Sequence, residues 1–200
     1  MIKNIIFDFG DIFVNLRKEA TVQAFQQLGI NPFTADLAAL NTAYEIGAIS
    51  EMDFLSGFQK QNPATDILAI RSAWNQIIGD FPLKRLEFLQ LLKPNYRLFL
   101  LSNTDATHIS YFEHQVGLSF SRDFYNCFEK VYFSYEMGMR KPDPICFQTV
   151  LTRHELQPKY TLFIDDKKEN TDAAAALGLS VWNLHVGQED VVQLFDKKLL

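Results

Sequence analysis

The sequence feature that most constrains the fold is a short apolar segment near the N-terminus that ends in a carboxylate. Ile5, Ile6 and Phe7 form a nearly continuous apolar run, and Asp8 follows them directly. Such a run is typical of a strand that is buried on both faces of a parallel sheet. Ligands of open α/β sheets bind beyond the carboxyl ends of the strands, so Asp8 stands where a functional group is expected. Taken alone, Asp8 fits equally well as a residue that merely starts a turn.

Most of the chain alternates between strand-like and helix-like segments. Apolar runs predict further strands at 97–101, 130–134, 160–164 and 180–184. Amphipathic segments predict helices at 82–92, 106–116, 142–153 and 170–177, and a last segment, 189–195, closes the chain. Proline stands in the first turn of the helix at 82–92 and begins the helix at 142–153. We therefore expect an α/β fold, a Rossmann-like three-layer core with a mostly parallel sheet.

Residues 17–80 interrupt this alternation because they predict helices only. The expected helices span 17–28, 34–46, 50–61 and 65–78. Ser50 is the expected N-cap of the third, with Asp53 three residues later as in a capping box. We therefore expect two units: a core made of residues 1–16 and 81–200, and an inserted all-helical unit made of residues 17–80.

Composition excludes several classes of protein. Two hundred residues suffice for one domain with a modest insertion. A net charge of −5 without a basic run argues against nucleic-acid binding. No apolar run approaches the ~18 residues of a membrane helix. Because Asp8 interrupts the first apolar run, we expect no signal-peptide core of the usual length. Cys127 and Cys146 are expected to be buried free thiols. We expect a cytoplasmic protein with no nucleic-acid, membrane or obligate protein partner.

Polar residues follow three of the predicted strands and precede one helix. They are Asp8, Ser102-Asn103-Thr104, Asp165-Asp166 and Arg140-Lys141-Pro142. Each is ordinary alone: Lys141 as a solvated lysine, Ser102 as a turn residue, Asp165 as a loop start. In a parallel sheet, however, they converge on one edge, where carboxylates repel one another unless a cation lies among them. Mg²⁺ prefers such oxygen ligands, and a lysine and a hydroxyl beside it suit a phosphoryl group.

These residues resemble the four motifs of the haloacid dehalogenase-like (HAD) superfamily of aspartyl phosphatases. Asp8 matches the first motif, Ser102 the second, Lys141 the third, and Asp165-Asp166 with Asn170 the fourth. The resemblance covers nearly the whole chain, and it makes residues 17–80 similar to the family's helical cap. The Asp-x-Gly form of the first motif and the run 137–142 look most like the α-D-glucose-1-phosphate phosphatase-type subfamily.

The resemblance implies a mechanism and a role for each matching residue. Asp8 would attack phosphorus and form an aspartyl-phosphate, which water then hydrolyses. Asp8, the backbone carbonyl of Gly10 and Asp166 would hold Mg²⁺, supported by Asp165 and Asn170. Lys141, Ser102 and the backbone N–H of Asn103 would bind the phosphoryl group. The expected substrate is a small phosphate monoester, with a sugar phosphate favoured.

One position departs from the family pattern. The family's usual second acid, two residues after the nucleophile, is Gly10 here. This leaves the carbonyl ligand intact but removes the side chain that donates a proton to the leaving group, an effect worth ~10²–10⁴-fold in rate. We hold as a hypothesis that Asp11 partly substitutes. Arg17, at the start of the helical unit, is either a ligand of a substrate hydroxyl or phosphate or an ordinary solvated helix-start residue. Tyr44, Glu45 and Trp74 within the unit are candidates to face the pocket, with core packing the favoured role for Trp74.

Two other functions are compatible with parts of this pattern. A haloacid dehalogenase also lacks the second acid, but it needs no metal and so gives no reason for the pair Asp165-Asp166. A phosphate-binding or regulatory protein with weak turnover is favoured by Gly10 alone. Against it, a site kept only for binding would not need the nucleophile Asp8 together with Lys141 and Asp166.

Overall fold

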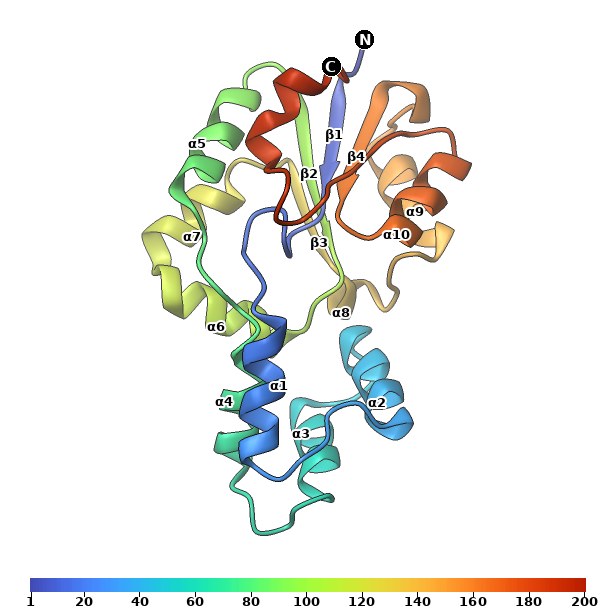
Figure 1. Cartoon of the computed structure of the whole chain (residues 1–200). Coiled ribbons are helices and arrows are strands. Elements are labelled where there is room, and N and C mark those ends of the chain that lie inside the picture. The colour runs from blue at the N-terminus through green and yellow to red at the C-terminus, as the bar shows by residue number, and fades with distance from the viewer.

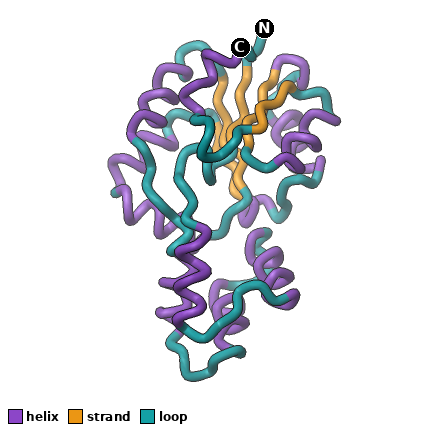
Figure 2. Tube along the Cα trace, viewed as in Figure 1, coloured by secondary structure: helices purple, strands orange, loops and turns teal.

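The computed structural model describes residues 1–200 and contains one five-stranded sheet. Figures 1 and 2 show the sheet with helices on both of its faces. Its strands are β1 (Asn4–Phe7), β2 (Arg97–Ser102), β3 (Lys130–Phe133), β4 (Thr161–Asp165) and β5 (Ser180–Asn183). The strand order is β3-β2-β1-β4-β5, and every pairing is parallel. The predicted α/β fold is confirmed. Because the chain builds outward from β1 to β3 and then returns to add β4 on the other side, the strand order reverses beside β1, where such folds bind ligands.

Alternate residues of the central strands pack into two different hydrophobic cores. Ile5 and Phe7 belong to the larger core, whereas Ile6 belongs to the smaller one on the opposite face. This explains why the run has no polar residue: both faces of the strand are covered. The larger core is covered by α5 (Leu83–Leu92), α6 (Ala106–Val116) and α7 (Leu118–Tyr125), and the smaller by α9 (Pro144–Arg153) and α10 (Lys168–Ala176) (Figure 1).

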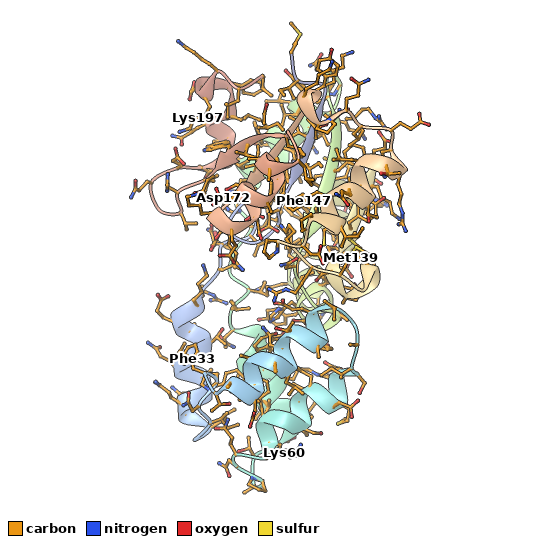
Figure 3. The ribbon with its side chains drawn as sticks, turned by 90° about the vertical axis from the view of Figure 1, so that its right-hand side faces the viewer. Phe33, Lys60, Met139, Phe147, Asp172 and Lys197 are labelled. Atoms are coloured by element: carbon orange, nitrogen blue, oxygen red, sulfur yellow. The ribbon has the colours of Figure 1, made fainter.

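Four helices lie between β1 and α5 in the chain, as the sequence predicts. They are α1 (Lys18–Gln27), α2 (Ala35–Glu45), α3 (Glu51–Gln59) and α4 (Ile67–Asn75). They enclose a third hydrophobic cluster, in which Phe25, Phe54 and Phe58 are almost fully buried. Ser50 and Asp53 form the expected capping box at the start of α3. These helices sit beyond the carboxyl ends of the strands (Figures 1 and 3).

The chain enters and leaves the four helices through two segments that run side by side. Leu16 and Ile78 form an antiparallel bridge. Around it, Asn15 N–H donates to Asp80 O (2.9 Å), and Arg17 N–H donates to Ile77 O (2.8 Å). The helical part is therefore joined to the sheet through a narrow, hydrogen-bonded pair of connections.

Several predicted boundaries are wrong, and a side-chain cap explains one of them. The helix expected from Pro142 begins at Pro144, because the Asp143 side chain accepts a hydrogen bond from Ile145 N–H and so caps it there. Pro82 is the N-cap of α5 and does not lie within its first turn.

Other segments had a different conformation from the expected one or were not predicted. Helix α10 starts at Lys168, so Asn170 lies inside its first turn. The last segment is a 3₁₀ helix, Val191–Lys197. Helix α7, the short α8 (Ser134–Met137) and a 3₁₀ turn at Pro158–Tyr160 were not predicted. None of the helices combines the length and the apolar character that crossing a membrane requires.

Candidate active site

Asp8, Lys141 and Asp165 form a buried ionic cluster at the carboxyl ends of β1 and β4. These strands are neighbours in the sheet, so the residues that end them lie side by side. The Lys141 Nζ donates to Asp8 Oδ1 at 2.8 Å and to Asp165 Oδ2 at 2.7 Å. Lys141 is only 1% exposed, so the alternative that it is a solvated surface lysine is excluded.

Cys127 and Cys146 are buried free thiols, as predicted.

Burial and neighbouring charges shift the pKa values of this cluster in opposite directions. Burial raises the pKa of Asp8 above its ordinary range, although the charge of Lys141 opposes the shift. Burial on its own would lower the pKa of Lys141, but Asp165 and Asp8 outweigh it and the pKa is raised. Lys141 is thus held as a cation, and its charge favours the carboxylate form of Asp8 that a nucleophile requires.

Asp166 brings a third carboxylate to the same point. The chain bends after β4, so Asp165 and Asp166 both approach Asp8, and carboxylate oxygens of the three residues lie within 4.8 Å of one another. The Asp166 carboxylate makes no hydrogen bond within the chain, and burial raises its pKa, with Asp165 and Asp11 adding to the shift. Three acids so close together, one of them without a partner, fit a divalent cation.

Asn170 adds a second observation that fits a cation. Its Nδ2 donates to both oxygens of Asp165 (3.1 and 3.0 Å), whereas its Oδ1 is buried and has no hydrogen-bond partner. A buried acceptor without a partner indicates a missing donor or ion. The donor set around Asp8 is therefore all oxygen, as Mg²⁺ prefers.

Gly10 leaves its carbonyl oxygen free, but the space for a side chain is taken. No N–H of the chain donates to the Gly10 carbonyl. A Cβ at this position would lie 2.9 Å from Leu16 Cδ1. Leu16 thus packs where the family's usual second acid would project.

Ser102 is the last residue of β2, the neighbour of β1, and Asn103 follows it; their side chains have different partners. Ser102 is 2% exposed, and its hydroxyl makes no hydrogen bond within the chain. The Asn103 side chain instead pairs with the backbone of Lys141, donating to its O (2.8 Å) and accepting from its N–H (2.9 Å). Asn103 therefore positions the Lys141 loop, a role that the sequence analysis missed.

Asp11, the candidate acid, and Arg17, the candidate substrate ligand, have other partners. Asp11 Oδ1 accepts from Leu16 N–H (2.9 Å) and its Oδ2 from Lys18 Nζ (2.9 Å). The Arg17 Nη2 donates to Ile78 O at 2.7 Å. This geometry favours structural roles for Asp11 and Arg17 at the connection to the helices.

Residues of α2 and α4 contact the start of α6. Tyr44 Oη and Thr107 Oγ1 are 2.5 Å apart, and Trp74 Nε1 donates to Asp105 Oδ2 at 3.1 Å. The same Asp105 oxygen lies 3.0 Å from His108 Nδ1. Asp105 and His108 were not identified from the sequence. Their spacing of three residues occurs at many helix starts and does not by itself indicate a site. Trp74 both packs and hydrogen-bonds.

Comparison with known proteins identifies the family. A model described as haloacid dehalogenase-like hydrolase matches residues 2–178. D-ribitol-5-phosphate phosphatase of Bacteroides thetaiotaomicron is 28% identical to the chain, covering 94% of it and 95% of the relative. L-2-haloacid dehalogenase PA0810 has a TM-score of 0.64 at 18% identity, which shows a shared fold only.

Solved structures agree with this. A HAD family enzyme of Bacteroides thetaiotaomicron has a TM-score of 0.88 at 32% identity, with 97% of this chain and 98% of that one covered. Its complex with magnesium and inorganic phosphate has a TM-score of 0.84 at 31% identity, with 94% and 97% covered. The prediction of Mg²⁺ is confirmed for the family by that complex. The chain belongs to the haloacid dehalogenase-like hydrolase family and is a hydrolase of that type.

Proposed function

We propose that the protein is a Mg²⁺-dependent phosphatase that hydrolyses a small phosphate monoester through an aspartyl-phosphate on Asp8. The observation that carries the proposal is the buried Lys141, which lies 2.8 Å from Asp8 and 2.7 Å from Asp165, with Asp166 beside them. A carboxylate kept charged by a buried cation, beside a set of oxygen ligands, suits phosphoryl transfer.

In the first step, an oxygen of Asp8 attacks phosphorus, and the bond from phosphorus to the substrate's alcohol oxygen breaks. The alcohol oxygen takes up a proton from a solvent water molecule as it leaves, because the chain places no acidic side chain at Gly10. Water then attacks the phosphorus of the aspartyl-phosphate, which releases inorganic phosphate and restores the carboxylate. Lys141 offsets the negative charge on the transferring group, and the free hydroxyl of Ser102 donates to a phosphoryl oxygen, aided by the N–H of Asn103.

Asp8, Asp166 and the Gly10 carbonyl would hold Mg²⁺, with Asp165 and Asn170 in support. Bound there, Mg²⁺ would supply positive charge to the phosphoryl oxygens. Asp165 already accepts from Lys141, Asn170 and Lys167 N–H, so its part is to orient these groups. The acidic pair also argues against a metal-free dehalogenase.

Residues 17–80 act, in this proposal, as a cap over the site, with residues 1–16 and 81–200 as the core. The separate hydrophobic cluster of the four helices and their two paired connections support this division. The similarity to D-ribitol-5-phosphate phosphatase supports a sugar or polyol phosphate as substrate. The assignment to the α-D-glucose-1-phosphate phosphatase-type subfamily stays a prediction.

The test is phosphate release from a panel of sugar, polyol, nucleotide and aryl phosphates, with Mg²⁺ or EDTA. We expect Mg²⁺-dependent release that Asp8→Asn abolishes. Asp172→Asn serves as the control, because Asp172 is an exposed carboxylate that pairs with Lys168.

If no compound is hydrolysed, the phosphatase proposal is wrong. In that case, a rise in melting temperature with beryllium fluoride and Mg²⁺ would identify a phosphate-binding protein instead.

A further inference from the structure

The carboxyl end of α2 is packed directly against the α/β part of the molecule. Gly47, just after α2, has φ +68°, and a Cβ there would overlap the carbonyl oxygen of Tyr135 in α8. Only glycine permits this close approach of the two backbones. Figure 1 shows α2 next to α8, and in Figure 3 Met139, which follows α8, lies at the edge facing the helices. Glu45, the last residue of α2, is therefore held at this contact.

Glu45 forms an ion pair with the residue that precedes Lys141. Its Oε2 lies 3.1 Å from Arg140 Nε, and the two side chains are 17% and 34% exposed. Arg140 is adjacent in the chain to the lysine that contacts Asp8. Lys167, which follows Asp166, also acts on Glu45 electrostatically. Glu45 is thus a residue of the helical part that faces the surroundings of the active site.

The Glu45–Arg140 pair has hydrogen-bonding capacity that the chain leaves unused. Glu45 Oε2 and Arg140 Nε are both buried and face each other at 3.1 Å, whereas Glu45 Oε1 and the two Nη atoms of Arg140 make no hydrogen bond or ion pair within the chain. A carboxylate oxygen accepts hydrogen bonds and a guanidinium Nη donates them, so one acceptor and two donor groups are left for a ligand.

We propose that Glu45 and Arg140 bind hydroxyl groups of the substrate's leaving group and so select sugar and polyol phosphates. A hydroxyl can donate to Glu45 and accept from Arg140, which an alkyl or aryl group cannot do. The Glu45 carboxylate also neutralises Arg140, which disfavours a second phosphate and hence nucleoside di- and triphosphates. This inference rests on the proposed phosphatase function and names its substrate class.

The experiment compares ribitol 5-phosphate with n-pentyl phosphate, which has the same chain length and the same primary-alcohol leaving group but no other hydroxyl. We expect the wild type to favour the polyol phosphate. Glu45→Gln should lower kcat/KM for ribitol 5-phosphate by about 10- to 100-fold and leave pentyl phosphate nearly unchanged, as expected for one hydrogen bond to a charged group. Arg140→Gln should act in the same direction.

The control is Glu51→Gln, because Glu51 is a second carboxylate of the helical part that pairs with an arginine, Arg71, at 2.8 Å. It should not change the preference. Equal loss with both substrates in Glu45→Gln would assign the residue a structural or proton-transfer role and overturn the inference. So would a wild type that does not discriminate between the two.

An aryl phosphate, measured in parallel, separates this inference from the proposed function. Its hydrolysis without any preference for ribitol 5-phosphate would overturn the inference alone. Failure to hydrolyse all three compounds would overturn both.

Discussion

At the scale of single residues, the site is defined by three clustered carboxylates, two of which pair with one ammonium. Removing a lysine from water is costly, and Lys141 is 1% exposed, so its contacts with Asp8 and Asp165 are what make its burial possible. Asp166 adds negative charge that no cation of the chain contacts within ion-pair distance. The excess of negative charge is the physical reason for a metal ion here.

Asp11 offers a direct test of whether another acid substitutes at Gly10. Its two carboxylate oxygens already accept hydrogen bonds from Leu16 N–H and Lys18 Nζ, so neither is free for the leaving group. Asp11→Asn keeps an oxygen for Leu16 N–H, and Asn tolerates the positive φ of 57° at this position. We expect kcat within about threefold of wild type, well below the ~10²-fold loss typical of a missing general acid. A loss of that larger size, with an unchanged melting temperature, would identify Asp11 as the acid.

At the scale of elements, the start of α6 is where the inserted helices contact the α/β part. Asp105 caps α6 by accepting from His108 N–H (2.9 Å), and it also contacts the His108 and Trp74 side chains. The Trp74 and His108 rings stack with centroids 4.8 Å apart. One carboxylate therefore both begins a helix of the α/β part and holds a residue of α4.

This contact predicts a pH-dependent contribution to stability. Burial on its own would lower the pKa of His108, but Asp105, the Trp74 carbonyl and Glu45 together raise it. Because the folded pKa lies above the unfolded one, about 6.5, the stabilisation is complete below that pH and is lost as pH rises through the folded pKa. We expect His108→Gln to lower the free energy of unfolding by about 2 kcal/mol at pH 6 and by less at pH 9.

Urea unfolding at the two pH values measures this difference. The matched control is His114→Gln, which changes an exposed histidine of the same helix and should have no pH-dependent effect. A His108→Gln loss that is equal at both pH values would contradict the ion-pair interpretation.

At the scale of the whole molecule, the chain contains three separate hydrophobic clusters. Two cover the faces of the sheet and the third lies within α1–α4. The acidic residues lie between the sheet and these helices. The hydrophobic clusters carry no charge that could compensate them. In the function proposed above, the helical part shields the site from water, while the sheet positions the reacting groups.

Magnesium should accordingly stabilise the whole protein. At a concentration of Mg²⁺ 100 times its Kd, binding raises the melting temperature by about 5 to 10 °C relative to EDTA. Asp166→Asn should remove most of this shift, and Asp172→Asn should not. The shift should also shrink as pH falls, because the raised pKa values of Asp8 and Asp166 favour protonation, which competes with the metal. A shift that survives in Asp166→Asn would place the ion elsewhere.

Local pattern was sufficient to predict most of the elements. The apolar runs within β1, β2 and β4 are short but contain no polar residue, because both faces of the sheet are covered, so they were recognisable without the fold. Boundaries were less predictable: Pro142 and Pro144 are equivalent as helix starters in sequence, and the Asp143 cap decides between them. Helix α7 follows Gly117, which also ends α6, so the two helices look like one helix and a loop.

The features of the candidate site also divide into those that local sequence predicts and those that it does not. Asp8, Ser102 and Asp165 each end a strand, and parallel strands bring such residues together whatever the rest of the chain does, so their convergence follows from local pattern. Contacts between distant segments do not follow from local pattern, because they depend on how the helices pack against the sheet. Four such contacts are the hydrogen bonds of Asn103 with the Lys141 backbone, the Leu16 side chain beside Gly10, the Trp74–Asp105–His108 contact and the Glu45–Arg140 pair. Local sequence thus specifies which groups are available for chemistry, whereas their charge states and partners are set by burial and by neighbours distant in the chain.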